Sequence, residues 1–245
     1  DIKPIGWRAK VGVIVPPSNT VNEAEFNRAA PDGVSFHFTR SPLHADPAND
    51  DFKEMLDDVK NAMGDLSACR VDYATYACTA GSMACPADLL LGTMSEAGNV
   101  SANSTAEAIL AALAAVGAKK IVMASPYTEE TNAHEAHYLS GHGIEVLAST
   151  GLSLNTTLKN IQKISRVPPP DVFEHAKSID KAEADALLMP DTALHSSAWL
   201  TDLEQAIGQP ILTANQVSFW EALRLCGKLS PQSGLGSLFE HMPED

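Results

Sequence analysis

The sequence predicts an α/β protein built from two similar halves, each with a mostly parallel sheet, and with the active site in the cleft between their strand ends. Apolar strand-like runs alternate with helical patterns along the whole chain. Val13-Ile-Val-Pro-Pro-Ser-Asn-Thr20 and Val122-Met-Ala-Ser-Pro-Tyr-Thr-Glu129 both read as a strand, a proline and a polar helix start. Nearly the same number of residues separates Pro17 from Cys78 as separates Pro126 from Asp191. These observations favour an internal duplication.

Length and composition indicate an ordinary globular enzyme. The chain has 245 residues, of which 44% are hydrophobic and 20% charged, enough for one large domain or two smaller ones. The formal net charge of −14, without a cluster of Lys or Arg, argues against nucleic acid and anionic membranes as partners. A carboxylate substrate remains compatible, because backbone N–H groups and hydroxyls at helix starts bind anions.

The cysteine pattern predicts a cytoplasmic protein without a metal site. Its four cysteines form neither a CxxC motif nor a Cys/His metal spacing, as is typical of reduced thiols. No apolar run is long enough for a membrane span, and residues 1–7 do not resemble a signal peptide. Walker, GxGxxG and GxSxG motifs are absent from the sequence, so no nucleotide cofactor is expected.

In the first half, residues 9–15 form a continuous apolar run typical of a strand buried on both faces. We expect a helix at 21–29 that Ser18, Asn19 or Thr20 caps, and a strand, polar loop and helix start in this order can bind an anion. The alternative is that these side chains only cap the helix. A second strand at 34–39 and a helix at 50–66 follow.

The next segment centres on residues 73–82, a short buried strand that ends in a small-residue turn with Cys78 at the start of a helix. The helical piece at 83–91 is interrupted early by Pro86. Residues 101–116 predict one helix that is hydrophobic nearly all round. Such a helix must be buried between the halves or between subunits, and we therefore expect a homodimer or a higher homo-oligomer.

The second half repeats the order of strands and helices. A strand at 119–125, a helix running to residue 140 and a strand at 144–148 precede a polar loop at 151–157. We then expect the following segments: a helix at 172–184, the Asp191 strand, a helix at 199–207, a strand within 208–215, a helix at 216–225 and a tail at 230–245 packed on the first half. The predicted domains are 1–116, completed by 216–245, and 117–215.

Cys78 is the strongest candidate for a nucleophile. In parallel α/β folds, reactive groups lie at the carboxyl ends of strands. A thiol at a helix N-terminus is expected to have a lowered pKa, which favours the thiolate. The alternative is a buried structural cysteine.

Asp191 occupies the mirrored place in the second half. It follows the apolar run Ala186-Leu-Leu-Met-Pro190 and precedes a Thr192-Ala193 turn, as Cys78 precedes Thr79-Ala80. A carboxylate there either caps the following residues or faces Cys78, where the pair can exchange protons with a carbon atom or activate a water. Tyr127 either donates its hydroxyl to a substrate oxyanion or fills the cleft wall, and Asn155 is a further candidate.

Four motifs resemble a known family. They are Val11-Gly-Val-Ile-Val-Pro-Pro-Ser-Asn-Thr-Val-Asn-Glu-Ala-Glu-Phe26, Tyr76-Ala-Cys-Thr-Ala80, Ala124-Ser-Pro-Tyr-Thr-Glu-Glu-Thr-Asn132 and Ser218-Phe-Trp-Glu-Ala-Leu-Arg224. Together they resemble maleate cis-trans isomerase and arylmalonate decarboxylase of the Asp/Glu racemase superfamily. The resemblance implies two Rossmann-like halves and a cofactor-independent enzyme acting on a small carboxylate.

The resemblance also implies site roles. Isomerases of this type use two cysteines, of which the first attacks the double bond and forms a succinyl-like adduct, and Cys78 matches that first cysteine. Asn19, Tyr127 and Asn155 match carboxylate-binding positions, and Thr79 with the backbone of Ala80 matches oxyanion donors. By the same mirrored pattern, Ser18, Thr192 and Ala193 are expected to contact substrate.

The chain departs from the family at one position, because Asp191 stands where the second cysteine is expected. We expect a maleate-type isomerase with Cys78 as nucleophile and Asp191 as acid and base. The sequence leaves open a racemase or decarboxylase of a small carboxylic acid, a cysteine-dependent hydrolase of an amide or ring, and a non-catalytic dicarboxylate-binding protein.

Overall fold

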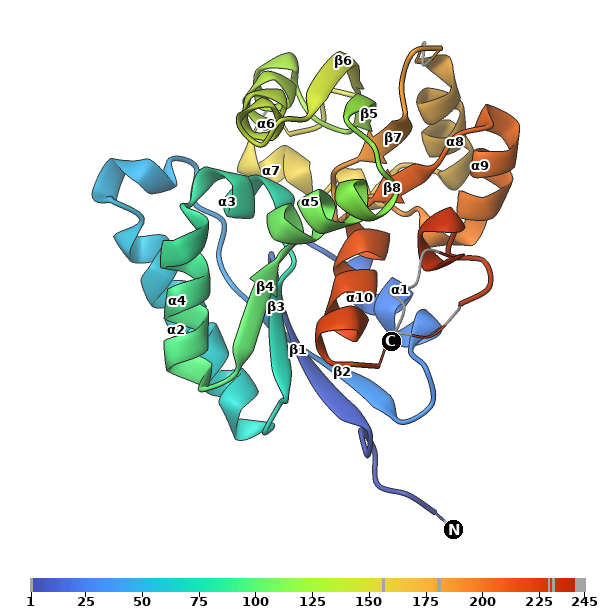
Figure 1. Cartoon of the computed structure of the whole chain (residues 1–245). Helices are drawn as coiled ribbons and strands as arrows, with labels where there is room; N and C mark the ends of the chain where they lie inside the picture. The colour runs from blue at the N-terminus through green and yellow to red at the C-terminus, as the bar shows by residue number, and fades with distance from the viewer. Residues whose placement is uncertain (1, 156, 180–181, 229, 231, 241–245) are drawn as a thin grey trace.

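The computed structural model describes residues 2–155, 157–179, 182–228, 230 and 232–240. Its described part contains two four-stranded parallel sheets with helices packed on their faces (Figure 1). The first sheet has the order β2-β1-β3-β4 and the second the order β6-β5-β7-β8, so each strand has a counterpart in the other half. The predicted fold class is confirmed. The strands are β1 (Ala9–Val15), β2 (Val34–Arg40), β3 (Tyr73–Tyr76), β4 (Ser101–Ser104), β5 (Lys120–Ser125), β6 (Glu145–Gly151), β7 (Ala186–Met189) and β8 (Ile211–Thr213).

Helices cover both faces of the first sheet. The apolar stripe expected on the long helix is buried, with Met55, Val59 and Met63 at most 3% exposed, and it packs with α4 on one face. On the other face, α1, α5 and α10 share a core with β1. The bounds in this half are α1 (Asn22–Ala29), η1 (Pro47–Asp50), α2 (Lys53–Ala68), α3 (Thr79–Ala84) and α4 (Ala87–Gly98), followed by α5 (Thr105–Ala115).

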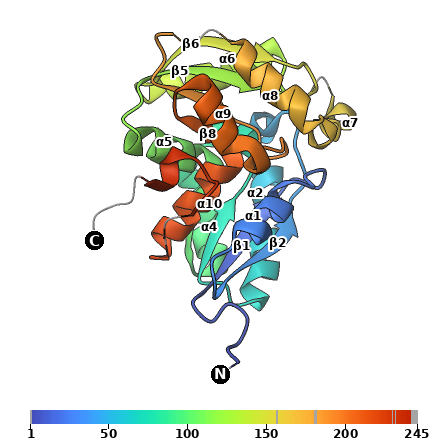
Figure 2. The same ribbon diagram turned by 90° about the vertical axis from the view of Figure 1, so that its right-hand side faces the viewer.

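The second sheet is covered in the same manner. Helices α8 and α9 lie on one face and α6 on the other (Figure 2). Val172 of α8 and Leu203 of α9 are fully buried in one apolar cluster, and Leu139 of α6 is fully buried in another. The bounds here are α6 (Glu129–Gly141), α7 (Leu158–Ile161), η2 (Ile164–Arg166), α8 (Pro169–Ser178), η3 (Ser197–Trp199), α9 (Leu200–Ile207), α10 (Ala214–Leu225) and η4 (Ser237–Glu240).

Helix α5 lies between the two sheets. Ile109, Ala112 and Leu113 are fully buried in a core that contains residues of both sheets, including Val11 and Met123. The expected burial of this apolar helix is therefore confirmed, and it is achieved within one chain. The oligomeric state and the proposed domain limits stay predictions.

Several predicted elements were wrong at their ends. Residues 101–104 pair with β3 as a strand, and α5 begins only at Thr105, because the Ser104 side chain accepts the N–H of Glu107 as an N-cap. Helix α8 ends at Ser178 rather than at residue 184; residues 180–181 lie outside the described part.

The described part of the C-terminal tail packs on the first half, as expected, since Phe239 lies in the core that contains Phe26 and its ring is 6.0 Å from that of Phe219 in α10; it also contacts α9 of the second half. Ser237 donates to Glu204 of α9, and the Gln216 amide of α10 donates to the carbonyl of Leu235. Residues 231 and 241–245 lie outside the described part. No described helix has the length and apolar character that crossing a bilayer requires.

Candidate active site

Cys78 and Asp191 occupy equivalent positions in the two halves. Strand β3 ends at Tyr76 and β7 at Met189, and one residue then separates each strand from the candidate side chain. Cys78 has an extended backbone (φ −146°, ψ 110°) and directly precedes α3. The strand-end placement expected for both groups is therefore present.

The two side chains line one cavity of about 80 Å³. Its walls come from both halves, since Asn19 and Cys78 follow strands of the first sheet whereas Tyr127 and Asp191 follow strands of the second. All ten residues predicted from the sequence line it, although their individual roles stay predictions. The described lining residues are Pro16, Ser18, Asn19, Leu43, Cys78, Thr79, Ala80, Tyr127, Asn155, Ile161, Ile164, Asp191, Thr192 and Ala193.

A larger outer cavity of about 500 Å³ adjoins this inner cavity. The two share Leu43, Ala80, Asn155 and Ile161 as lining residues. Further described lining residues of the outer cavity are Pro42, His44, Ala45, Pro47, Met55, Tyr76, Gly81, Ala84, Glu130, Thr131, His134 and Thr157.

Burial dominates the state of Cys78. Cys78 is 6% exposed, and desolvation raises its pKa to about 11, whereas the Gly81 N–H and the Tyr76 hydroxyl lower it. The expectation of a lowered pKa at the helix start was wrong. A helix of six residues does not offset the loss of water around the sulfur.

Asp191 is held by hydrogen-bond donors around it. Its Oδ1 accepts the backbone N–H of Ala193 at 2.6 Å, and the Tyr127 hydroxyl and the Leu194 N–H further lower the pKa of the carboxyl group. Burial nevertheless raises the pKa of Asp191 to about 6. The capping role and the cavity-facing position, posed as alternatives from the sequence, occur together.

The pKa values of the two groups fix where the proton rests. With about 11 for Cys78 and about 6 for Asp191, the free site holds a thiol and a carboxylate at neutral pH. Moving the proton from sulfur to carboxylate costs roughly 7 kcal/mol, at about 1.4 kcal/mol per pKa unit. A bound substrate and the donors around the sulfur must offset this cost if Cys78 is to react as a thiolate.

The amide side chains at the site hold the two halves together. Asn19 Oδ1 accepts the N–H groups of Val21 and Asn22, which caps α1, and its Nδ2 donates to Thr192 Oγ1 at 3.1 Å. Thr192 Oγ1 in turn donates to the carbonyl oxygen of Ala77 at 3.1 Å. The chain of bonds fixes the loop after β7 against the loop after β3, which places Cys78 and Asp191 relative to each other.

The side-chain amide of Asn155 makes hydrogen bonds to residues at the start of α6. Its Oδ1 accepts the Thr128 N–H at 2.7 Å, and its Nδ2 donates to Thr131 Oγ1 at 2.8 Å. The Tyr127 hydroxyl donates to the carbonyl of Pro190 at 3.3 Å. In the free site both side chains therefore support the cavity wall; their proposed contacts with substrate stay predictions.

Glu135 of α6 is a buried acid near the site that the sequence did not single out. It is 0% exposed, and neither carboxyl oxygen has a hydrogen-bond partner among the described residues. Burial, and then the charge of Asp191, raise the pKa of Glu135 well above its ordinary value. Helix α6 has no clear apolar face in the sequence, so the burial of Glu135 could not be predicted from the pattern.

Apolar lining residues were also missed. Leu43 lies in the loop after β2, and Ile161 and Ile164 belong to α7 and η2. Pro16 directly follows β1 and was read only as a strand terminator. The expectation that site residues lie at the ends of strands does not apply to residues in these later loops and helices, whose placement depends on tertiary packing.

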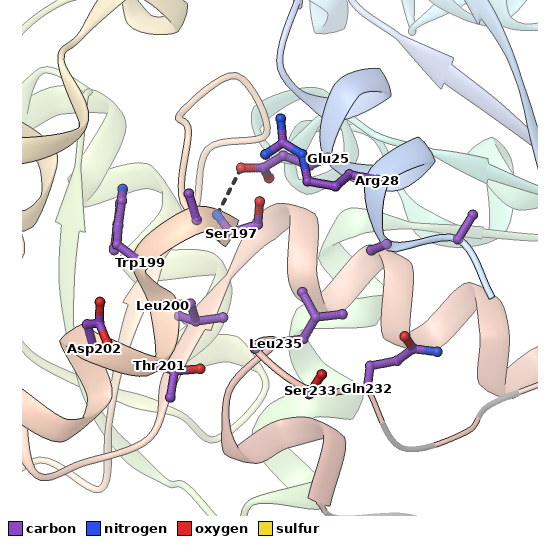
Figure 3. Close-up of a pocket in the computed structure, with 14 residues that line it drawn as sticks. Glu25, Arg28, Ser197, Trp199, Leu200, Thr201, Asp202, Gln232, Ser233 and Leu235 are labelled. Atoms are coloured by element: carbon purple, nitrogen blue, oxygen red, sulfur yellow. Dashed lines mark hydrogen bonds between the residues drawn. The ribbon is translucent and has the colours of Figure 1, made fainter.

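Another cavity, of about 400 Å³, lies where α1, α9 and the tail meet (Figure 3). Its one buried acid, Glu25, is already satisfied, because Oε1 accepts the N–H groups of Ser196 and Ser197 at 2.8 and 2.9 Å. No described lining residue is a cysteine. The inner cavity is therefore the better candidate for chemistry.

Comparisons with known proteins agree with this geometry. A family model described as arylmalonate decarboxylase matches residues 11–239. The maleate isomerase of Geobacillus stearothermophilus is 25% identical over 247 aligned residues, covering 94% of this chain and 96% of that protein. The arylmalonate decarboxylase of Bordetella bronchiseptica is 26% identical over 151 residues, covering 60% of this chain and 61% of that protein.

Solved structures share the fold. A variant of the maleate isomerase from Pseudomonas putida S16, crystallised with maleate, has a TM-score of 0.85 at 22% identity and covers 95% of this chain and 98% of its own. A Nocardia farcinica maleate cis-trans isomerase mutant with a covalently bound succinylcysteine intermediate has a TM-score of 0.83 at 21% identity, covering 96% and 99%.

Proposed function

The chain belongs to the arylmalonate decarboxylase family, whose model spans most of its length, and from this premise we propose that it is a cofactor-independent cis-trans isomerase of a small, maleate-like unsaturated dicarboxylate. One observation carries the proposal: a thiol from one half and a carboxyl group from the other line the same small buried cavity. The similarity to maleate isomerases over nearly the whole chain supports it.

In the proposed reaction, the proton of Cys78 first passes to Asp191. The thiolate attacks one alkene carbon, a C–S bond forms, and the electrons of the double bond move to the neighbouring carbon, which takes the proton from Asp191. The new C–C single bond then rotates. Asp191 removes a proton from the same carbon, the double bond re-forms as the C–S bond breaks, and the trans acid leaves.

The cavity offers neutral groups for the two carboxylates of such a substrate. None of its described lining residues is Lys or Arg; hydroxyls, amides and backbone N–H groups at the starts of α3 and of the turn after Asp191 are present instead. Fixed dipoles of this kind stabilise anions when water is excluded. We assign carboxylate binding to Ser18, Asn19, Thr79, Ala80, Tyr127, Asn155, Thr192 and Ala193.

The test is to incubate the protein with maleate and follow fumarate by proton NMR. We expect turnover by the wild type and none by Cys78→Ala. Cys85→Ala is the matched control, since Cys85 is also a free, buried thiol but does not line the inner cavity, and it should retain activity. Tight maleate binding without turnover would instead identify a dicarboxylate-binding protein.

Asp191→Cys restores the pair of cysteines expected from the resemblance. If Asp191 serves as the acid and base, this variant keeps isomerase activity whereas Asp191→Ala loses it. Solvent deuterium entering a saturated acid at its α-carbon, with no fumarate from maleate, would favour a racemase. Carbon dioxide release from an arylmalonate would favour a decarboxylase.

We also propose a cytoplasmic location and a homodimeric assembly. The four cysteines are all free thiols, as is typical of a reducing compartment. Because α5 is buried within the chain, the dimer no longer follows from that helix, and light scattering on the purified protein tests it.

A further inference from the structure

Tyr76 lies beside the sulfur of Cys78 but was assigned no role by the sequence. It is the last residue of β3, its side chain is 4% exposed, and it packs in the same apolar cluster as Cys78 and Cys85. Its hydroxyl lies near the Cys78 sulfur, because one Cβ atom placed on Gly81 would contact both, and this hydroxyl lowers the pKa of the thiol. Tyr76 lines the outer cavity and Cys78 the adjoining inner one.

Gly81 completes the arrangement around the sulfur. Its backbone N–H, in the first turn of α3, lowers the pKa of Cys78. A Cβ atom at this position would lie 2.8 Å from Tyr76 Oη and 3.3 Å from Cys78 Sγ, so a side chain there would force the hydroxyl away. The absence of a side chain lets one hydroxyl and one amide approach the sulfur from the same turn.

These donors oppose every other influence on the thiol. Burial disfavours the thiolate, and the charges of Asp191 and Glu135 do so as well. No described cation lines the inner cavity to compensate. The pKa of Tyr76 is itself raised well above its ordinary value by burial, so its hydroxyl keeps its proton and acts as a donor throughout the working pH range.

We propose that the Tyr76 hydroxyl and the Gly81 amide form a two-donor site for the Cys78 thiolate, and that Tyr76 is a positioning residue for this nucleophile. The inference rests on the proposed role of Cys78 but not on the identity of the substrate. Hydrogen bonds to an ionised acceptor are stronger than those to a neutral one, so the two donors favour the thiolate over the thiol.

The test needs no substrate. The rate of carboxamidomethylation of Cys78 by iodoacetamide is measured from pH 7 to pH 11 by peptide mass spectrometry. Tyr76→Phe, which removes only the hydroxyl, should slow the reaction at pH 8 by about tenfold or more and move its pH profile upward, because a hydrogen bond to a charged group is lost. The exposed thiol of Cys69 provides an internal reference that should not change.

Tyr73→Phe is the matched control. Tyr73 is in the same strand and equally buried, but it packs in the core on the opposite face of the sheet, away from Cys78. The Tyr73→Phe variant should have the same pH profile of Cys78 alkylation as the wild type. Should Tyr76→Phe fail to fold, Gly81→Ala displaces the same hydroxyl and should show the same upward shift.

An unchanged rate and pH profile at Cys78 in the folded Tyr76→Phe variant, or in Gly81→Ala, would overturn the inference. The proposed function is tested separately. If the wild type does not convert maleate but its alkylation profile still depends on Tyr76, the role of Tyr76 is supported and maleate is rejected as the substrate. Conversely, if the wild type converts maleate but Tyr76→Phe leaves the alkylation profile unshifted, the isomerase activity is supported and the role of Tyr76 is rejected.

Discussion

At Asp191 and Glu135, the site contains two acids that water does not reach freely. Among the described residues neither acid forms an ion pair with a cation, and both pKa values are raised chiefly by burial. Removing an ionised group from water costs free energy that must be recovered elsewhere in the molecule. Sites held in such a state commonly reduce stability in exchange for reactivity.

Asp191→Asn is expected to stabilise the protein at pH 8. The folded pKa of about 6 lies above the unfolded value of 3.8, so the folded state binds more protons and its stability falls as pH rises through this window. The substitution removes this penalty, which amounts to roughly 3 kcal/mol at full ionisation. Thermal unfolding should show a higher Tm for the variant at pH 8 and little difference at pH 4; a variant less stable at pH 8 would contradict this.

Glu135→Met is expected to raise stability as well. The wild-type carboxyl group must take up a proton on folding above its ordinary pKa of 4.5, and its oxygens find no partner among the described residues. A methionine of similar length removes both costs, for a gain of at least about 1 kcal/mol at pH 7 that grows with pH. Glu129→Met, an exposed position on the same helix, is the control and should change urea unfolding little.

A site residue could be predicted from the sequence where it lies at the end of a strand, because the strands themselves could be predicted. Cys78, Asp191 and Tyr127 were found because each directly follows a short apolar run, and parallel strands of a duplicated fold bring such positions together. The direction of the Cys78 pKa was not predictable. It depends on how completely the surrounding chain excludes water from the sulfur, and no local pattern reports that.

At the scale of elements, helix ends are fixed by single side chains rather than by apolar runs. Residues 101–104 were read as helix because they precede an alanine-rich segment, yet they complete the parallel sheet beside β3. Ser104 is both the last residue of β4 and the N-cap of α5. The existence and order of the elements followed from hydrophobic patterns, whereas this boundary required a strand partner distant in sequence.

Helix α10 has the most complete cap. Thr213 Oγ1 accepts the N–H of Gln216 at 3.3 Å, and Gln216 Oε1 accepts the N–H of Thr213 at 3.1 Å. Thr213→Val keeps the volume but leaves a buried N–H without its acceptor, and it should cost about 1 to 2 kcal/mol in urea unfolding. Thr93→Val within α4 is the control, and a similar loss there would contradict the capping account.

At the scale of the whole molecule, a buried carboxylate joins the two halves. Glu25 of α1 is 4% exposed, and besides the N–H groups of Ser196 and Ser197 it accepts the amide of Asn215 at 2.7 Å. Together with the Thr192 bonds at the inner cavity, these contacts fix the distance between the strand ends. The chemistry proposed for Cys78 and Asp191 depends on that distance.

Glu25→Ala should therefore destabilise the whole fold. The substitution leaves buried donors without an acceptor and should cost roughly 3 kcal/mol, observed as one lowered cooperative unfolding transition. Glu23 lies on the same helix with 44% of its side chain exposed, in an ion pair with Arg40, and Glu23→Ala should cost less than about 1 kcal/mol. Equal losses for the two variants would contradict a link between the halves through Glu25.

The reaction itself is tested most directly by the mass of the Cys78 peptide after the Asp191→Asn variant is incubated with maleate. Because the proposed reaction uses Asp191 to take the thiol proton and deliver it to carbon, neither the Asp191→Asn peptide nor the Cys78→Ala peptide should gain mass, whereas the wild-type peptide from a reaction stopped with acid during turnover should gain the mass of one maleic acid. An unmodified Cys78 peptide in a variant that still forms fumarate would contradict the account.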